Sequence, residues 1–174
     1  MAKQISLREF QQGLAQRLRE AQTEAEPTSR LGVQTGGRHW LLKLDDAGEM
    51  LPLPEISSVP LTKSWYLGMA NIRGVLASVV DFGAFMGGEA TVRTPECRLL
   101  LIAERFQSFS GLVISRMLGL KNVQIMQATE EATDRTWVGT AYRDNDGRLW
   151  RELDIAALVA HDDFLHVAHS APRT

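Results

Sequence analysis

The sequence has little of several features that mark particular classes of protein. Its 174 residues include a single cysteine, Cys97, so the chain cannot form an internal disulfide. No apolar run approaches the roughly 18 residues that span a bilayer, and the N-terminal stretch MAKQISLREF has no apolar core of a signal peptide. A formal net charge of −2 argues against nucleic-acid binding through a basic surface. We therefore expect a soluble, cytoplasmic, globular protein.

Motifs of common catalytic and nucleotide-binding sites are also missing. The chain contains no GxSxG, GK[ST], GxGxxG or CxxC motif. Residues 81–83 read DFG, as in protein kinases, but a kinase also needs a glycine-rich loop and an HRD catalytic loop, which are absent. The three histidines of HDDFLHVAH, at positions 161, 166 and 169, match no known metal-ligand spacing and predict a solvated tail. We expect no enzyme activity, no cofactor and no metal.

The hydrophobic pattern predicts mainly short strands. LGVQT and HWLLKL flank Gly36 and Gly37, as in a β-hairpin, and VLASVV, RLLLIA, SGLVI, TWVGTAY and RLWREL are further short runs. RDNDG separates the last two runs and predicts a second tight turn, for which Gly147 supplies a positive φ. Three prolines exclude a continuous helix between residues 51 and 61. This pattern is typical of a barrel-type β protein.

Helices are expected only near the two ends of the chain. Residues 6–24 begin with Ser6 and Glu9 at the spacing of a capping box. Their apolar residues recur at helical intervals: Leu7, Phe10, Leu14, Leu18 and Ala21. The polar stretch EAEPTSR follows, so this helix should dock on the main domain or on a partner. Near the other end, LDIAALVA predicts a short helix with Asp154 as its N-cap.

The most informative stretch is LGMANIRGVLASVVDFGAFMG, residues 67–87, where Arg73 interrupts an apolar run. A guanidinium stays charged and is costly to bury unpaired, so Arg73 must be exposed at a turn or paired with an anion. Asp81 would lie about 26 Å away along one extended strand, at about 3.3 Å per residue, which is too far for an ion pair. Gly74 is expected to let the chain turn, and Asp81 to cap the turn that DFG makes.

A phosphate-accepting receiver domain is a rival interpretation of the acidic residues. Asp45 and Asp46 could supply the acidic pair, Asp81 the phosphate acceptor and Lys121 the conserved lysine, in the required order. A receiver alternates strands with helices, however, and the segment between the two acidic sites contains three prolines. The pattern also leaves open a phosphate-accepting His161, and a purely structural β interaction module.

WYLGMANIRGVLASVVDFGAFMG resembles the CheW family of chemosensory adaptors, in which an Asn-Leu-Arg-Gly core precedes a β run and an Asp-Leu pair. The residues at those positions are Asn71, Ile72, Arg73, Gly74, Asp81 and Phe82. The resemblance covers about residues 31–160.

The flanking segments resemble the same family. HWLLKLDDAGEML places Ala47, Glu49 and Met50 at a Val-x-Glu-Ile turn, and TWVGTAYRDNDGRLWRELDIAAL resembles the closing hairpin and helix. Ser115 departs from the pattern, since an acidic residue is common there, and Ala47 is smaller than the usual valine. With its extra N-terminal helix, the chain is most similar to the PilI branch, whose members serve the chemosensory system of type IV pili.

The resemblance implies a mainly β fold of two interlocked five-stranded SH3-like barrels, with an N-terminal helix and a short C-terminal helix. It divides the chain into a helical extension at 1–29, a CheW-like domain at 30–165 and a polar tail at 166–174. The two lobes are expected to meet near residues 88–97.

The resemblance also implies a non-enzymatic adaptor that couples the cytoplasmic tip of a methyl-accepting chemoreceptor to the regulatory domain of a CheA-type histidine kinase. Such an adaptor would work at membrane receptor arrays without inserting into the membrane, and here would control twitching motility. The partner-binding residues implied are Ala47, Glu49, Met50, Asn71, Arg73 and Gly74. Asp81 and Gly147 are expected to be structural turn residues, and whether Arg73 holds the fold or the partner stays open.

Overall fold

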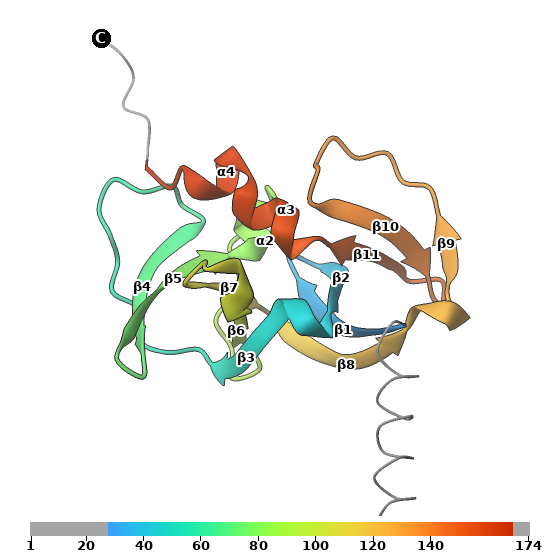
Figure 1. The fold of residues 1–174 in the computed structure, drawn as a ribbon, viewed down its shortest axis with the longest axis horizontal. Coiled ribbons are helices and arrows are strands. Elements are labelled where there is room, and N and C mark those ends of the chain that lie inside the picture. The colour runs from blue at the N-terminus through green and yellow to red at the C-terminus, as the bar shows by residue number, and fades with distance from the viewer. Residues whose placement is uncertain (1–27, 169–174) are drawn as a thin grey trace, which may run out of the picture.

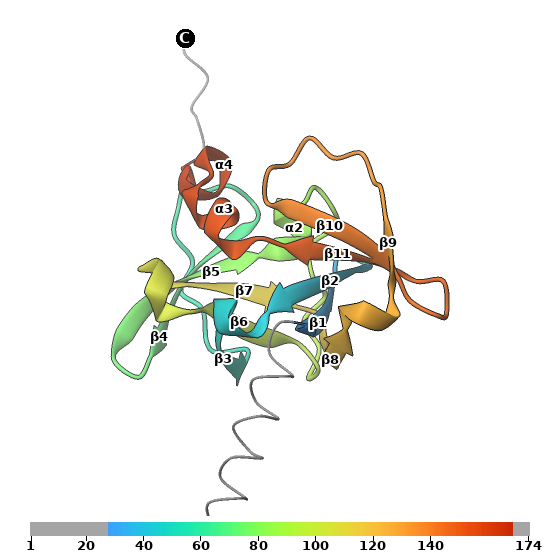
Figure 2. The same ribbon diagram turned by 45° about the vertical axis from the view of Figure 1, so that its right-hand side comes forward.

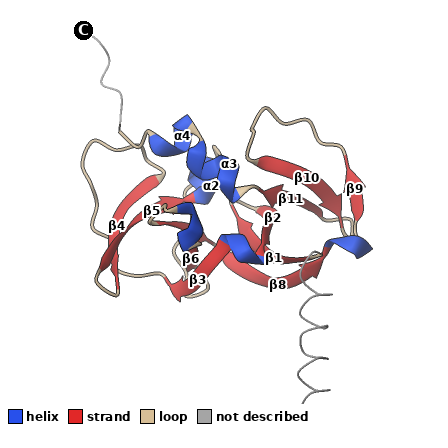
Figure 3. Cartoon of the chain, viewed as in Figure 1, coloured by secondary structure: helices blue, strands red, loops and turns tan. Residues whose placement is uncertain are grey.

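The structure, a computed structural model, describes residues 28–168. Eleven strands form two sheets, joined by short helices (Figures 1 and 3). The expected mainly β fold is therefore confirmed. The helix predicted at residues 6–24 lies outside the described residues.

The first sheet has six strands in the order β8-β1-β2-β11-β10-β9. Its strands are β1 (Ser29–Thr35), β2 (Arg38–Lys43), β8 (Arg116–Asn122), β9 (Gln127–Thr129), β10 (Val138–Arg143) and β11 (Leu149–Leu153). Both predicted hairpins are present: β1 turns into β2 at Gly36 and Gly37, and β10 turns into β11 through Gly147, where φ is +77°. The parallel pairing of β11 with β2 brings the two ends of the domain together.

The second sheet has five strands in the order β3-β6-β7-β5-β4. Its strands are β3 (Ala47–Pro52), β4 (Tyr66–Ile72), β5 (Val75–Asp81), β6 (Arg98–Ile102) and β7 (Ser110–Ile114). Neighbouring strands are antiparallel except β5 and β7, which run parallel. The resemblance implied five strands per lobe. The six-stranded sheet has one strand more, and its edge strand β9 is only three residues long.

The path of the chain interlocks the two lobes. It leaves the six-stranded sheet through η1 (Leu44–Asp46), builds all five strands of the second sheet, and returns at Ser115. Residues 88–97, where the lobes were expected to meet, connect α2 (Phe82–Phe85) to β6, both on the five-stranded side. The lobes are thus joined at η1 and at Ser115, and the six-stranded lobe is not a continuous piece of sequence.

The C-terminal helices complete this interlocking by crossing back over the five-stranded lobe (Figure 2). These are α3 (Ile155–Ala160) and α4 (Asp162–Leu165). Asp154 caps α3, as predicted, by accepting a hydrogen bond from the N–H of Ala157 at 3.0 Å. The sequence pattern did not predict α4, because the residues before Phe164 are polar. Phe164 is the one buried residue of α4, and it stacks on Trp65 of the five-stranded lobe. Beyond α4, Ala168 bridges to Thr62.

Of the two apolar clusters among the described residues, the larger is the core between the sheets, and the smaller belongs to the five-stranded sheet alone. Trp40 is fully buried in it and meets Phe82 edge-on, with ring centroids 5.2 Å apart. Both sheets and the helices supply the core residues, which include Leu31, Val33, Leu42 and Leu153 from one sheet, Val80, Leu100, Ile102, Leu112 and Ile114 from the other, and Phe85, Ile155, Leu158 and Phe164 from the helices. Since each such side chain contributes about 1.5–3 kcal/mol when buried, separating the lobes would expose the core of both.

Asp81 joins the end of β5 to α2 as a buried carboxylate. Its Oδ1 accepts hydrogen bonds from the N–H of Ala84 at 3.2 Å and the hydroxyl of Thr91 at 2.8 Å, while Oδ2 accepts the N–H of Thr91 at 2.6 Å. The DFG sequence is therefore the N-terminal cap of a one-turn helix. Asp81 also fastens the 88–97 connection to the sheet.

We predict that Asp81→Ala lowers the free energy of unfolding by about 3 kcal/mol, because buried donors lose charge-assisted hydrogen bonds. Urea denaturation followed by tryptophan fluorescence measures this loss. Thr91→Val is the matched control, since it removes only the hydroxyl bond and should cost about 1 kcal/mol. Equal losses for the two variants would contradict the capping role.

Asp144 holds the β10–β11 turn that contains Gly147. It accepts hydrogen bonds from the indole Nε1–H of Trp150 at 2.9 Å and from the N–H groups of Asp146 and Arg148 at 3.0 and 2.9 Å. Burial by itself would raise the pKa of Asp144, but these hydrogen bonds and the charge of Arg148 together lower its pKa below the usual value. The ionised carboxylate is thus the form that the folded turn favours.

We expect the stabilisation from Asp144 to depend on pH. Because its folded pKa is lowered, the contribution is complete above the unfolded value of about 3.9 and is lost as the pH falls through the folded pKa. Denaturation midpoints of the parent and Asp144→Ala should therefore differ more at pH 7 than at pH 3. The exposed neighbour Asp146, changed to Ala, serves as control and should alter stability less. A difference independent of pH would refute the carboxylate's role.

Candidate functional site

β4 and β5 meet in a two-residue turn made by Arg73 and Gly74. Ile72 pairs with Val75, and φ is +53° at Arg73 and +88° at Gly74. Positive φ at both central positions is the geometry of a type I′ turn, which favours Asn followed by Gly. Asn71 closes the turn by accepting the N–H of Gly74 at 2.7 Å. Arg73 thus has a backbone conformation, with positive φ, that is energetically unfavourable for arginine.

Arg73 is also paired with an anion. Its Nη2 lies 2.5 Å from Oε1 of Glu49 in β3, with the two side chains 75% and 40% exposed. Since β3 and β4 are the outermost strands of the five-stranded sheet, this contact joins its two edges and closes the curved sheet. An ion pair this exposed is worth only about 0–1 kcal/mol. Both expectations for Arg73, exposure at a turn and pairing with an anion, therefore hold, and Asp81 is not its partner.

A half-open groove of about 240 Å³ lies beside this ion pair. Polar side chains rim it, and apolar ones line it: Ile72, Val75, Ala77, Leu101, Ile102 and Phe109. Val75 is 49% exposed and Phe109 66% exposed. We call Glu49, Ile72, Arg73, Val75 and Phe109 the hairpin-tip surface. It combines an apolar floor with one cation and one anion, which suits contact with a protein partner.

The remaining predicted partner-binding residues have different surroundings. Ala47 and Met50 are half-buried and pack against the core between the sheets. Asn71 and Gly74 shape the turn through their hydrogen bond. Of the six residues, only Glu49 and Arg73 line the groove, and direct partner contact by any of them stays a prediction.

Sequence reasoning missed Phe109 and Val75 as surface residues. Val75 belongs to a run that reads as a buried strand, but the hairpin carries its first residue beyond the core. A usable signal existed for Phe109, because it stands between two serines in the polar stretch QSFSG. A large aromatic residue in such a loop is typical of an exposed contact.

Comparison with known proteins identifies the family. The model of the CheW-like domain matches residues 30–163. The chain belongs to the CheW-like domain family. Protein PilI of Pseudomonas aeruginosa (strain PAO1) is 30% identical to it in an alignment 155 residues long that covers 85% of each chain. This confirms the resemblance predicted from the NIRG segment.

A solved CheW structure shares the fold. The crystal structure of scaffolding protein TtCheW from Thermoanaerobacter tengcongensis matches this chain with a TM-score of 0.64 and 15% identity, over 79% of this chain and 95% of the other. CheW-like domains are non-catalytic scaffolds and adaptors, so membership supports an adaptor role in chemosensory signalling. In the part of the chain that the structure describes, no helix is long and apolar enough to cross a membrane.

The CheW-like fold contradicts the receiver interpretation. Both oxygens of Asp81 accept hydrogen bonds inside the protein, so the carboxylate is not free to accept phosphate. Asp46 is buried and paired with Arg105. Lys121 belongs to the six-stranded sheet, where its Nζ lies over the ring of Trp150, 5.2 Å from the ring centroid. The residues that a receiver would bring to one site are therefore held in separate places.

The prediction of a solvated tail is wrong for residues 161–165, which pack on the domain as α4 and its cap, and His169 lies outside the described residues. His161 caps α4 through a hydrogen bond from the N–H of Asp163 to its Nδ1 at 3.1 Å, and its ring lies 4.3 Å from that of Trp137. Within residues 28–168, no three His, Cys, Asp or Glu side chains are placed to hold a metal ion. Trp65 is half-buried against Phe85 and Phe164.

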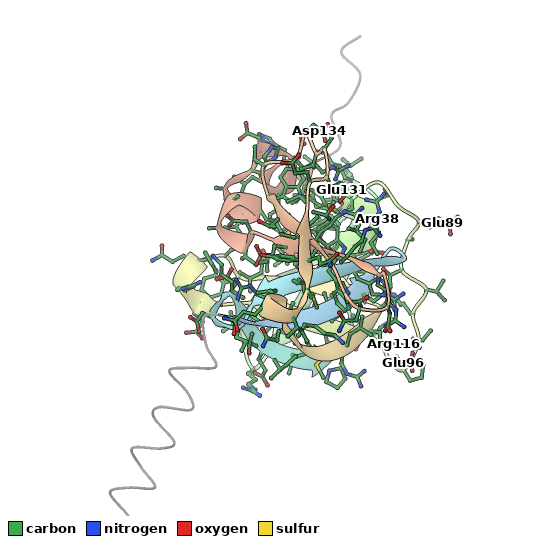
Figure 4. All side chains as sticks on the ribbon, turned by 90° about the vertical axis from the view of Figure 1, so that its right-hand side faces the viewer. Arg38, Glu89, Glu96, Arg116, Glu131 and Asp134 are labelled. Atoms are coloured by element: carbon green, nitrogen blue, oxygen red, sulfur yellow. The ribbon has the colours of Figure 1, made fainter. Side chains whose placement is uncertain are left out.

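A second, larger groove of about 670 Å³ lies on the six-stranded lobe, under the loop from β9 to β10. Arg38, Glu131 and Asp134 stand along it (Figure 4). Arg151 lines the same groove and pairs with Glu131 at 2.5 Å. Because cations and anions alternate here, this groove has no field of one sign to select a charged ligand.

The turn geometry predicts the effect of Arg73→Asn on stability. Asparagine adopts positive φ more easily than arginine, and the exposed ion pair contributes at most about 1 kcal/mol. We therefore expect the free energy of unfolding to stay within about 1 kcal/mol of the parent, on the more stable side. Urea denaturation measures it. A loss of more than about 2 kcal/mol would mean that Arg73 chiefly supports the fold.

Proposed function

We propose that this protein couples a methyl-accepting chemoreceptor to a CheA-type histidine kinase in the cytoplasm, at membrane receptor arrays, and acts in the control of twitching motility. Family membership and the 30% identity to PilI support this role. The structural observation that best supports this role is the unfavourable turn conformation of Arg73 beside an apolar groove.

The energetics of Arg73 favour a role in recognition. Its turn position suits asparagine better, and its exposed ion pair contributes little to stability. An exposed arginine next to apolar side chains is a common anchor at protein interfaces, where its guanidinium can meet a carboxylate and its stem can cover apolar surface. The hairpin-tip surface is therefore our candidate contact for the receptor or the kinase.

Glu49 has two effects in this arrangement. It orients the Arg73 guanidinium before a partner arrives, which reduces the side-chain entropy lost on binding. It also places a negative charge at the rim, which disfavours a partner with an acidic patch at that point. The remaining implied residues, Ala47, Met50, Asn71 and Gly74, would act by holding β3 and the hairpin in place.

A reconstituted kinase assay tests the proposed function. Receptor-dependent autophosphorylation of the kinase should rise when the protein is added to receptor and kinase. A structural β module would bind a partner and leave kinase activity unchanged. If the protein binds neither the receptor tip nor the regulatory domain, the adaptor proposal is wrong.

A charge-exchange cycle tests the hairpin-tip surface. We expect Arg73→Glu to weaken binding to one partner at least about tenfold, which corresponds to about 1.4 kcal/mol, with little change in stability. The double variant Arg73→Glu with Glu49→Arg should stay weak, because it restores the ion pair but not the cation at the turn. Calorimetry against each partner measures the affinities.

The matched control is Arg148→Glu, which reverses a similarly exposed arginine in the β10–β11 turn. It should leave both affinities within about twofold of the parent, since this turn belongs to the six-stranded lobe and exposed surface charges have small effects at moderate salt. Full recovery of affinity in the double variant would show instead that Arg73 acts only through its contact with Glu49.

A further inference from the structure

The core-facing side of the six-stranded sheet continues beyond the part that the other lobe covers. In the pairing of β1 with edge strand β8, Val33 lies opposite Met117, and Leu31 lies opposite Leu120. Directly paired residues share one face of a sheet. Val33 and Leu31 are buried in the core, whereas Met117 is 51% and Leu120 65% exposed. The apolar face therefore extends, uncovered, onto β8.

This face is limited to the edge strand and the turn after it. Ile125 in η3 (Val123–Ile125), 66% exposed, follows β8 directly. Arg116, at the start of β8, is paired with Glu96 at 2.6 Å (Figure 4). We call Met117, Leu120 and Ile125 the β8 apolar surface. Exposed apolar edge strands promote aggregation, and native proteins commonly cover them with a helix or loop.

The N-terminal part of the chain reaches this surface with a short connection. Ser29 pairs with Asn122 at the end of β8, and the carbonyl of Thr28 accepts the N–H of Val123 at 3.1 Å. Residues 25–28 alone separate this point from the segment 6–24. That segment repeats apolar residues at helical intervals, which would present one apolar stripe.

The dimensions and the tether favour this segment over a second copy of the chain. A helix of 19 residues is about 28 Å long at 1.5 Å per residue, and β8 extends about 23 Å at 3.3 Å per residue. A segment held by a short linker experiences an effective concentration in the millimolar range. A second copy at micromolar concentration would have to compete with it.

We propose that residues 6–24 bind back on the β8 apolar surface of the same molecule as an amphipathic helix. Such binding covers the uncovered end of the core face. A partner that uses this face must first displace the segment, so the segment would set the apparent affinity for that partner. The proposal does not depend on the identity of the receptor or the kinase.

Thiol labelling in the full chain tests this proposal. A single reporter cysteine is introduced as Leu120→Cys. Its rate of maleimide labelling is compared between this variant and one that also carries Leu14→Asp and Leu18→Asp, which place charges in the apolar stripe. We expect labelling to become at least tenfold faster with the two charges. The native Cys97 is buried, and the parent chain supplies its background rate.

Two controls define the outcome. Gln12→Asp with Gln16→Asp adds the same charge to the face of the predicted helix opposite the apolar stripe. This change should leave the rate of Leu120→Cys labelling unchanged. The reporter Leu76→Cys, at a residue 60% exposed on the β4–β5 hairpin, should label at the same rate in every background. Leu120→Cys labelling that is equally fast with and without charges in the stripe would overturn the proposal. Protection that weakens on dilution would also overturn it, because it would indicate binding between copies.

Discussion

The structure depends on one shared apolar core between two sheets that neither sheet could cover alone. Trp40 is fully buried in it, and the inner faces of both sheets close on it. The order of the strands follows from this constraint: the chain starts the first sheet, builds the whole second sheet, and returns to finish the first. Phe164 of the C-terminal helix α4 then packs on Trp65 and Phe85 of the five-stranded lobe. The lobes must therefore fold as one unit, which fixes the relative position of every surface an adaptor presents.

Against this fixed core, the charged side chains divide into two groups. Asp81 and Asp46 are buried and Asp144 is half-buried, and each accepts hydrogen bonds from other parts of the protein that hold a helix cap, a lobe junction and a turn. Arg73 and Glu49 stand in solvent at the tip of the five-stranded lobe and contribute little to stability. Asp81 and Asp46, whose positions in the sequence suggest a phosphate-accepting site, are structural. The exposed ion pair of Arg73 and Glu49 is the better candidate for recognition of a partner.

The two exposed apolar surfaces also differ from each other, in composition and in their place in the fold. The hairpin-tip surface lies at the end of a rigid two-residue turn and combines apolar and charged groups. The β8 apolar surface is a continuation of the core itself, left open at a sheet edge beside the point where the chain enters β1. The first suits a transient protein contact, and the second suits a segment tethered close by.

The sequence by itself determined seven of the strands (β1, β2, β5, β6, β7, β10 and β11), the hairpins at Gly36–Gly37 and at Gly147, the cap at Asp154 and the family, because these rest on local patterns: alternation, turn residues and motif order. It could not show that Arg73 meets Glu49, 24 residues away, since both strands must first curl into one closed sheet. Nor could it separate covered from uncovered apolar residues: Val33 and Met117 are alike in pattern, and only the packing of the second lobe buries one and leaves the other exposed. Tertiary structure decided these points because burial depends on what the rest of the chain places opposite each residue.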